Sequence, residues 1–129
     1  MFESISPDGK HVATYRSGGE MWMSGPEWGY LSIDNNEEIK GATQDILWSS
    51  DSQYIAFVKL VIDEVPNRKG TEGMSSRVAV VRLSDFKIRY CLGNNKLAEL
   101  KLKSCYLDEI SVLVNGQSKL IKLASIYWN

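Results

Sequence analysis

The chain has 129 residues and an ordinary globular composition, with 43% hydrophobic residues, 24% charged residues and a net charge of −1. This length suits one compact domain, and the apolar content is enough for a core, which excludes a wholly disordered chain. Residues 1–64 carry 4 basic and 11 acidic side chains, whereas residues 65–129 carry 11 basic and 5 acidic. This division excludes a uniformly basic nucleic-acid binder and predicts a dipolar molecule with one acidic patch.

No segment approaches the roughly 20 consecutive apolar residues of a membrane-spanning helix, and no signal-peptide pattern is visible. We therefore expect a cytoplasmic location and no membrane partner. Cys91 and Cys105 are too few and too far apart for a zinc site, and two buried reduced thiols are favoured over a disulfide. The sequence predicts neither a metal nor another cofactor.

Apolar and polar residues alternate with period two through most of the chain, which predicts β-strands. In chain order the clearest segments are 11–16, 77–83, 86–91, 97–103, 110–114 and 119–126. Turn signals separate them, among them Pro7-Asp8-Gly9, Gly25-Pro26, Asn35-Asn36, Ser84-Asp85 and Asn115-Gly116. No long segment has helical spacing. We therefore expect an all-β, antiparallel fold with about ten short strands.

A strand–turn–strand pattern occurs twice, 43 residues apart, and a third time more faintly. The copies are residues 2–15 (FESISPDGKHVATY), residues 45–58 (DILWSSDSQYIAFV) and, more faintly at an offset of 55, residues 102–114. Ser6 and Asp8 of the first copy align with Ser49 and Asp51 of the second. An offset of 43 residues lies within the roughly 40–45 residues of a four-stranded propeller blade.

The first copy, followed by Gly-Gly-Glu-Met-Trp-Met, resembles the TolB-type β-propeller repeat. The segment Leu-Trp-Ser-Ser-Asp-Ser-Gln-Tyr-Ile-Ala-Phe of the second copy resembles it too. The resemblance implies one domain, 1–129, of antiparallel four-stranded blades at approximately 1–44, 45–95 and 96–129, with an insertion at 63–76. Closed propellers have roughly four to eight blades, so three blades predict a partial propeller.

Residue types that carry catalysis are sparse. His11 is the single histidine and aligns with Tyr54 of the second copy, which favours a packing role. A pair of histidines for acid–base catalysis is therefore excluded, and no Gly-x-Ser-x-Gly turn accompanies His11. We expect no catalytic residues and a protein that is not an enzyme.

Acidic side chains concentrate in the segment Asp34-Asn35-Asn36-Glu37-Glu38, between the first two copies. It lacks the glycine and the distal glutamate of a calcium loop, which leaves a solvated turn or an acidic recognition surface. Trp28, in a turn, is the aromatic residue expected to be exposed as an interface anchor. The candidate partner-binding residues are Glu20, Glu27, Trp28, Asp34, Glu37, Glu38, Asp63 and Glu64.

Together these features favour a non-enzymatic protein-binding module. In size and charge the chain resembles small bacterial toxin-immunity proteins, which implies an inhibitor that covers the active site of a basic, nuclease-type toxin. One alternative is a fragment or scaffold domain of a larger β-propeller protein. A second is nucleic-acid binding through the basic half, where Lys87, Arg89, Lys101 and Lys103 are expected on strand faces. Such lysines are equally typical of the solvent face of an antiparallel sheet, so nucleic acid is the less favoured partner.

Overall fold

The computed structural model describes residues 2–20, 27–62, 74–92, 99–106 and 108–128. These residues form ten β-strands and one short 3-10 helix. The strands are β1 (Phe2–Ile5), β2 (Val12–Glu20), β3 (Glu27–Ile33), β4 (Ile39–Trp48), β5 (Tyr54–Ile62), β6 (Met74–Arg82), β7 (Lys87–Cys91), β8 (Leu100–Tyr106), β9 (Glu109–Val114) and β10 (Gln117–Lys122), and the helix is η1 (Leu123–Ser125). The prediction of an all-β chain with about ten short strands is confirmed. No helix in the described ranges is long and apolar enough to cross a membrane.

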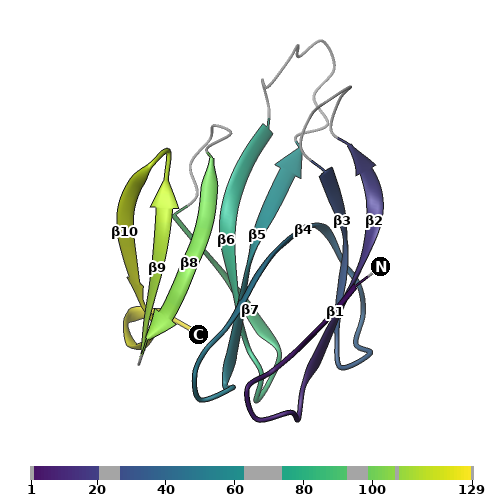
Figure 1. The fold of residues 1–129 in the computed structure, drawn as a ribbon, viewed down its shortest axis with the longest axis horizontal. Coiled ribbons are helices and arrows are strands. Elements are labelled where there is room, and N and C mark those ends of the chain that lie inside the picture. Colours follow the sequence, from purple (N-terminus) through teal and green to yellow (C-terminus); the bar gives the residue numbers. More distant parts are fainter. Residues whose placement is uncertain (1, 21–26, 63–73, 93–98, 107, 129) are drawn as a thin grey trace.

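The strands form two antiparallel sheets. In one sheet β1 to β7 lie in chain order, and in the other β9 lies between β8 and β10. Antiparallel neighbours can be joined by short turns, which explains why each strand pairs with the next along the chain within its sheet. Figure 1 shows β5 and β6 in the middle of the molecule, with β8–β10 on one side and β1–β3 on the other.

β4 links strands β1–β3 to strands β5–β7 within the seven-stranded sheet. Its first residues pair with β3 and its last with β5, and the register breaks between Ala42 and Ile46. Gly41 has a φ of +89°, and a Cβ there would lie 2.5 Å from the Leu60 carbonyl oxygen. Glycine is suited to this position because it adopts positive φ freely and lacks the atom that would collide. The blade boundaries near residues 44 and 95 stay predictions, and residue 95 lies outside the described residues.

Two hydrophobic cores lie on opposite faces of β5 and β6. The first includes Ala13, Tyr15, Leu31, Ile33, Ile55, Phe57, Ala79 and Val81. The second includes Ala56, Val58, Val78, Val80, Leu100, Leu102, Ile110, Val112 and Ile121. Successive residues of a strand point to opposite faces, so β5 and β6 supply alternate residues to the two cores. Burial on both faces explains why β5 is almost continuously apolar and why β6 has the apolar run Val78–Val81.

The three-stranded sheet is joined to β4 through Asp45, whose Oδ2 accepts a hydrogen bond from the backbone N–H of Leu102 at 2.9 Å. Burial raises the pKa of the Asp45 carboxyl, although the Leu102 hydrogen bond and the positive charge of Lys101 act in the opposite direction. Many residues of this sheet, among them Lys101 and Lys122, are exposed. Leu120 is an apolar exception, at 58% exposed.

The β1–β2 and β4–β5 turns have the same side-chain hydrogen bonds. Ser6 Oγ donates to Asp8 Oδ1 at 2.6 Å and accepts from the backbone N–H five residues later at 3.0 Å. Ser49 Oγ donates to Asp51 Oδ1 at 2.7 Å and accepts from the N–H five residues later at 2.9 Å. The two predicted copies therefore form structurally equivalent turns.

The backbone of these two turns is equivalent as well. Gly9 and Ser52, which are 43 positions apart, have φ values of 74° and 60°. The turns also contact each other, because Ser52 Oγ accepts a hydrogen bond from the N–H of Asp8 at 3.0 Å. The third copy differs, since β8 and β9 pair as far as Tyr106 and Glu109 and leave room for only a two-residue connection.

Candidate binding site

The turn between β3 and β4 contains three of the predicted partner-binding acids. Asp34 and Asn35 have φ values of 52° and 61°, a region that Asp and Asn tolerate better than most residues. Asp34 Oδ2 lies 2.6 Å from His11 Nδ1, and Asp34 Oδ1 accepts from the N–H of Val12 at 2.9 Å. The His11 ring also stacks on Trp48, with centroids 6.4 Å apart. Asp34 therefore holds the start of β2 against the end of β3.

Glu38 is occupied by an arginine. Arg16 Nε and Nη2 donate to the two carboxylate oxygens of Glu38 at 2.7 and 2.9 Å. These hydrogen bonds lower the pKa of Glu38. The Arg16 guanidinium carbon also lies 4.0 Å from the centroid of the Tyr30 ring. The negative charge of Glu38 is thus balanced on the sheet itself.

Trp28 is half-buried rather than exposed as the sequence suggests. Its ring lies so close to Gly18 that a Cβ there would be 2.4 Å from a ring carbon. It meets Tyr30 edge-on at 5.5 Å, and Lys40 Nζ lies 5.5 Å from its centroid. The absence of a side chain at Gly18 is what lets the ring lie against the strand, and this packing occupies much of its surface.

The remaining predicted acids are less informative. Glu27 is exposed and accepts a long hydrogen bond of 3.4 Å from Gln44 Nε2. The backbone of Glu20 pairs with Glu27 at the end of β2, but its side chain lies outside the described part of the structure. Asp63 and Glu64 also fall outside the described residues.

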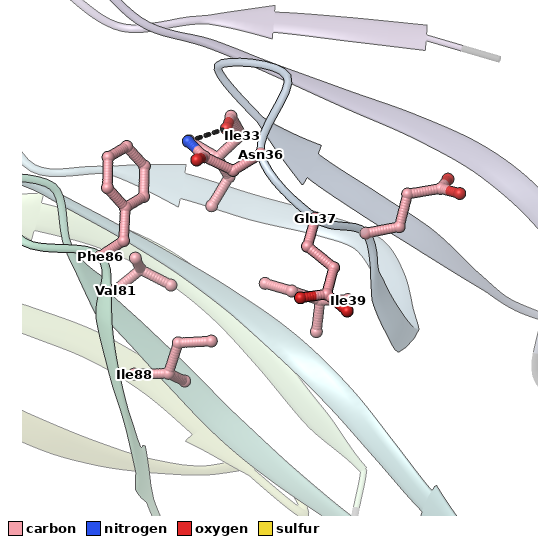
Figure 2. A pocket seen from close by; sticks show the side chains of 8 residues that line it. Ile33, Asn36, Glu37, Ile39, Val81, Phe86 and Ile88 are labelled. Atoms are coloured by element: carbon pink, nitrogen blue, oxygen red, sulfur yellow. Dashed lines mark hydrogen bonds between the residues drawn. The ribbon is translucent and has the colours of Figure 1, made fainter.

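A pocket of about 320 Å³ lies between the β3–β4 turn and the β6–β7 turn. Its lining residues are Ile33, Asn36, Glu37, Glu38, Ile39, Val81, Phe86 and Ile88. Figure 2 shows Phe86, Val81 and Ile88 on one side of the pocket and Asn36, Glu37 and Ile39 on the other. Glu37 is exposed and has no hydrogen bond or ion pair with any residue that the structure describes. The structure thus places Glu37 and Glu38 beside an apolar cavity.

The β6–β7 turn brings an aromatic ring to this pocket. Phe86 has a φ of 58° and is 37% exposed. Arg82 Nε and Nη2 bind the two carboxylate oxygens of Asp85 at 3.0 and 2.6 Å, which lowers the pKa of Asp85 to about 2. The ion pair lies within the turn itself, so the negative charge of Asp85 is balanced there by the positive charge of Arg82.

Sequence reasoning did not identify the β6–β7 half of the pocket. Ile88 and Val81 read as ordinary strand residues, and their approach to Ile39 depends on how the sheet bends. Phe86 does leave a signal, because a large aromatic residue directly after Ser84-Asp85 is unusual within a turn.

Some of the basic side chains in residues 65–129 form contacts within the fold. Arg89 Nε donates to the Tyr127 carbonyl at 2.9 Å and Arg89 Nη2 to the Trp128 carbonyl at 2.5 Å. The Trp128 ring stacks on Tyr54 at 5.8 Å, and the Arg82 guanidinium lies 4.8 Å from its centroid. Arg89 therefore fastens the C-terminal segment to β7, while Lys101, Lys103 and Lys122 are exposed.

Cys91 and Cys105 are not joined in a disulfide and are half-buried rather than fully buried. Burial raises the pKa of both thiols, which keeps them protonated and weakly nucleophilic. Within the described ranges no three His, Cys, Asp or Glu side chains are grouped as metal ligands.

No protein family and no curated protein matches this chain. Among solved structures, hydrazine synthase from Kuenenia stuttgartiensis is similar, with a TM-score of 0.60 and 17% sequence identity. The match covers 92% of this chain but only 38% of the hydrazine synthase chain. At this identity the similarity concerns the fold alone.

Proposed function

We propose that the chain is a non-enzymatic protein-binding module built as a partial propeller of three TolB-like blades. The first blade is β1–β3 with the first half of β4, the second is the other half of β4 with β5–β7, and the third is β8–β10. The equivalent turns 43 residues apart support this division. The similarity to hydrazine synthase over 92% of the chain supports it as well.

The pocket between the first two blades is the observation that carries the binding role. Apolar pockets with a few polar groups at the rim are typical of binding sites, and this one is lined by Glu37, whose carboxylate has no partner among the described residues. A negative charge at the edge of an apolar surface favours a partner with a complementary positive charge. The partner is therefore expected to be a basic protein.

Inhibition of a basic, nuclease-type toxin is the specific form of this proposal. Nucleases that bind phosphates present cationic active sites, which an acidic surface on a rigid sheet can cover. A cytoplasmic location belongs to the same proposal. Nucleic acid is a poorer candidate for the partner, because Arg89 is already hydrogen-bonded to carbonyl groups of the C-terminal segment.

The test is capture of the partner from the source cells with the tagged full chain, followed by purification of the captured protein. We expect a basic protein in a 1:1 complex, and loss of its nuclease activity when one equivalent of the chain is added. Glu37→Lys places a positive charge in the pocket and is expected to weaken the complex at least about tenfold. Glu3→Lys, at an exposed position of β1, is the matched control and is expected to leave the complex unchanged.

Two results would contradict the proposal. One is the absence of any stoichiometric protein partner, and the other is a complex that Glu37→Lys leaves as tight as the wild type. A captured partner that retains full nuclease activity would reject toxin inhibition and keep only the binding role.

A further inference from the structure

The pocket combines aliphatic side chains with a single unpaired carboxylate. Its aliphatic lining consists of Ile33, Ile39, Val81 and Ile88. Among the neighbouring acids, Asp34 is bound to His11 and Glu38 to Arg16. Glu37 forms no hydrogen bond or ion pair with any residue in the described ranges. The pocket therefore presents an apolar surface with one free negative charge beside it.

The backbone of Phe86 adopts a conformation that is unfavourable for a bulky side chain. Its φ of 58° lies in the left-handed region, which bulky residues avoid and which glycine or asparagine occupies in hairpin loops. The ring is 37% exposed and lines the pocket. Backbone strain of this kind is enriched at binding and active sites, and glycine at this position would relieve it but would remove the ring from the pocket.

We infer that the pocket receives one lysine or arginine side chain of the partner protein, an inference that rests on the proposed function. The methylene stem of the inserted side chain packs on Ile39 and Ile88, as such stems do on apolar surfaces. Its cation interacts with the Glu37 carboxylate and with the Phe86 ring. A lysine or arginine side chain would thus contact the apolar walls with its stem and the Glu37 carboxylate with its cation.

Other occupants fit the same pocket less well. An anion would be repelled by Glu37, and an uncharged apolar side chain would leave the Glu37 carboxylate without a partner as water is displaced. A metal ion would need further ligands, and the described residues hold no group of three metal-binding side chains. The volume of about 320 Å³ lies at the lower end of the range of ligand pockets, which suits one inserted side chain.

Three blocked tripeptides test the occupant directly. They are glycyl-lysyl-glycine, its arginyl counterpart, and its norleucyl counterpart, which has a similar stem but no charge. Amide chemical shifts of the isotope-labelled full chain are followed during titration with each peptide. We expect saturable shifts for a cationic peptide, confined to residues 33–39 and 81–88, and none for the norleucyl peptide. The tighter of the two cationic peptides identifies the inserted residue.

Two pairs of variants test the groups that hold the cation. Glu37→Gln is expected to weaken peptide binding at least about tenfold, whereas Glu3→Gln leaves it unchanged. Phe86→Gly is expected to weaken binding several-fold while raising Tm, because glycine relieves the left-handed strain. Leu92→Gly is the matched control, since Leu92 has a φ of 54° and is 36% exposed but does not line the pocket. It is expected to raise Tm without any change in binding.

Equal binding of the norleucyl peptide, shifts outside the two turns, or unchanged affinity in Glu37→Gln and Phe86→Gly would each overturn the inference. Its failure is distinguishable from failure of the proposed function. A captured basic partner without peptide binding rejects the side-chain receptor alone. Peptide binding at the pocket without any cellular partner rejects the proposed function alone.

Discussion

Tyr15 places a hydroxyl group in the first core. The hydroxyl is buried and has no hydrogen-bond partner among the residues that the structure describes. Glu27 lies near enough to act on it electrostatically without meeting hydrogen-bond geometry. Burial, and then the negative charge of Glu27, raise the pKa of Tyr15 to about 12. The hydroxyl is therefore protonated at neutral pH and has lost its water partners.

Removal of this hydroxyl group is expected to stabilise the protein. Tyr15→Phe keeps the ring in the core and eliminates an unsatisfied polar atom, so the free energy of unfolding is expected to rise by up to about 1 kcal/mol. Chemical denaturation at pH 7 measures the change. Tyr106→Phe, at a position that is 76% exposed, is the control and is expected to have no effect. A loss of stability in Tyr15→Phe would mean that the hydroxyl is hydrogen-bonded.

The same residue predicts a loss of stability at high pH. Unfolding returns Tyr15 from a pKa of about 12 to its ordinary value of 10.0. Between these two values the unfolded chain has lost a proton that the folded chain retains, so stability falls as pH rises. Thermal unfolding followed from neutral to strongly alkaline pH is expected to show a smaller decrease for Tyr15→Phe than for the wild type. Parallel curves for the two proteins would contradict this.

At the scale of the elements, β4 connects β1–β3 to β5–β7. It leaves β3 and joins β5 at a register break, and Gly41 provides the positive φ at the bend. A straight continuation of β4 would leave the apolar faces of β2 and β3 without the side chains of β5 and β6. The close approach of the Leu60 carbonyl leaves no space for a side chain at this position.

Gly41→Ala is expected to be strongly destabilising. The added Cβ would lie 2.5 Å from the Leu60 carbonyl oxygen in a left-handed conformation, so we expect a loss of about 3 kcal/mol or more. Gly9→Ala is the matched control, because Gly9 has a φ of +74° but nothing within 4 Å of a Cβ. The backbone penalty alone is about 1–2 kcal/mol. Equal losses for the two variants, measured by denaturant unfolding, would show that the contact with Leu60 is unimportant.

At the scale of the whole molecule, the two cores share β5 and β6. Leu31 lies in the first core and Ile110 in the second, and both are almost fully buried. Because the same two strands supply residues to both cores, unfolding of β5 and β6 disrupts both cores together. We therefore expect the chain to unfold in one cooperative transition.

Leu31→Ala and Ile110→Ala test this coupling. Each removes buried methyl groups and is expected to lower the free energy of unfolding by about 2–5 kcal/mol. Each is also expected to retain a single transition with an unchanged denaturant slope, as reported by fluorescence and circular dichroism together. A second transition in Ile110→Ala alone would show that β8–β10 unfolds separately.

Local patterns were readable from the sequence. The alternation of apolar and polar residues predicted the all-β fold, and the Ser6–Asp8 and Ser49–Asp51 turns followed from residue types two positions apart. Their hydrogen bonds lie within a few residues of chain, so they depend little on the rest of the molecule. The acidic segment 34–38 was also correctly recognised as part of a turn.

The availability of individual side chains was decided by contacts between distant parts of the chain. Asp34 and Glu38 are each held by a residue more than twenty positions away, whereas Glu37 between them is free of described partners. Trp28 is half-buried because its ring lies against Gly18, which is in the bulge of the neighbouring strand beside its register partner Gly19. The pocket joins residues 33–39 to residues 81–88 only because β4 bends at Gly41 and pairs with β5. Such pairings depend on strand register and sheet curvature, which residue type and spacing along a single sequence do not specify.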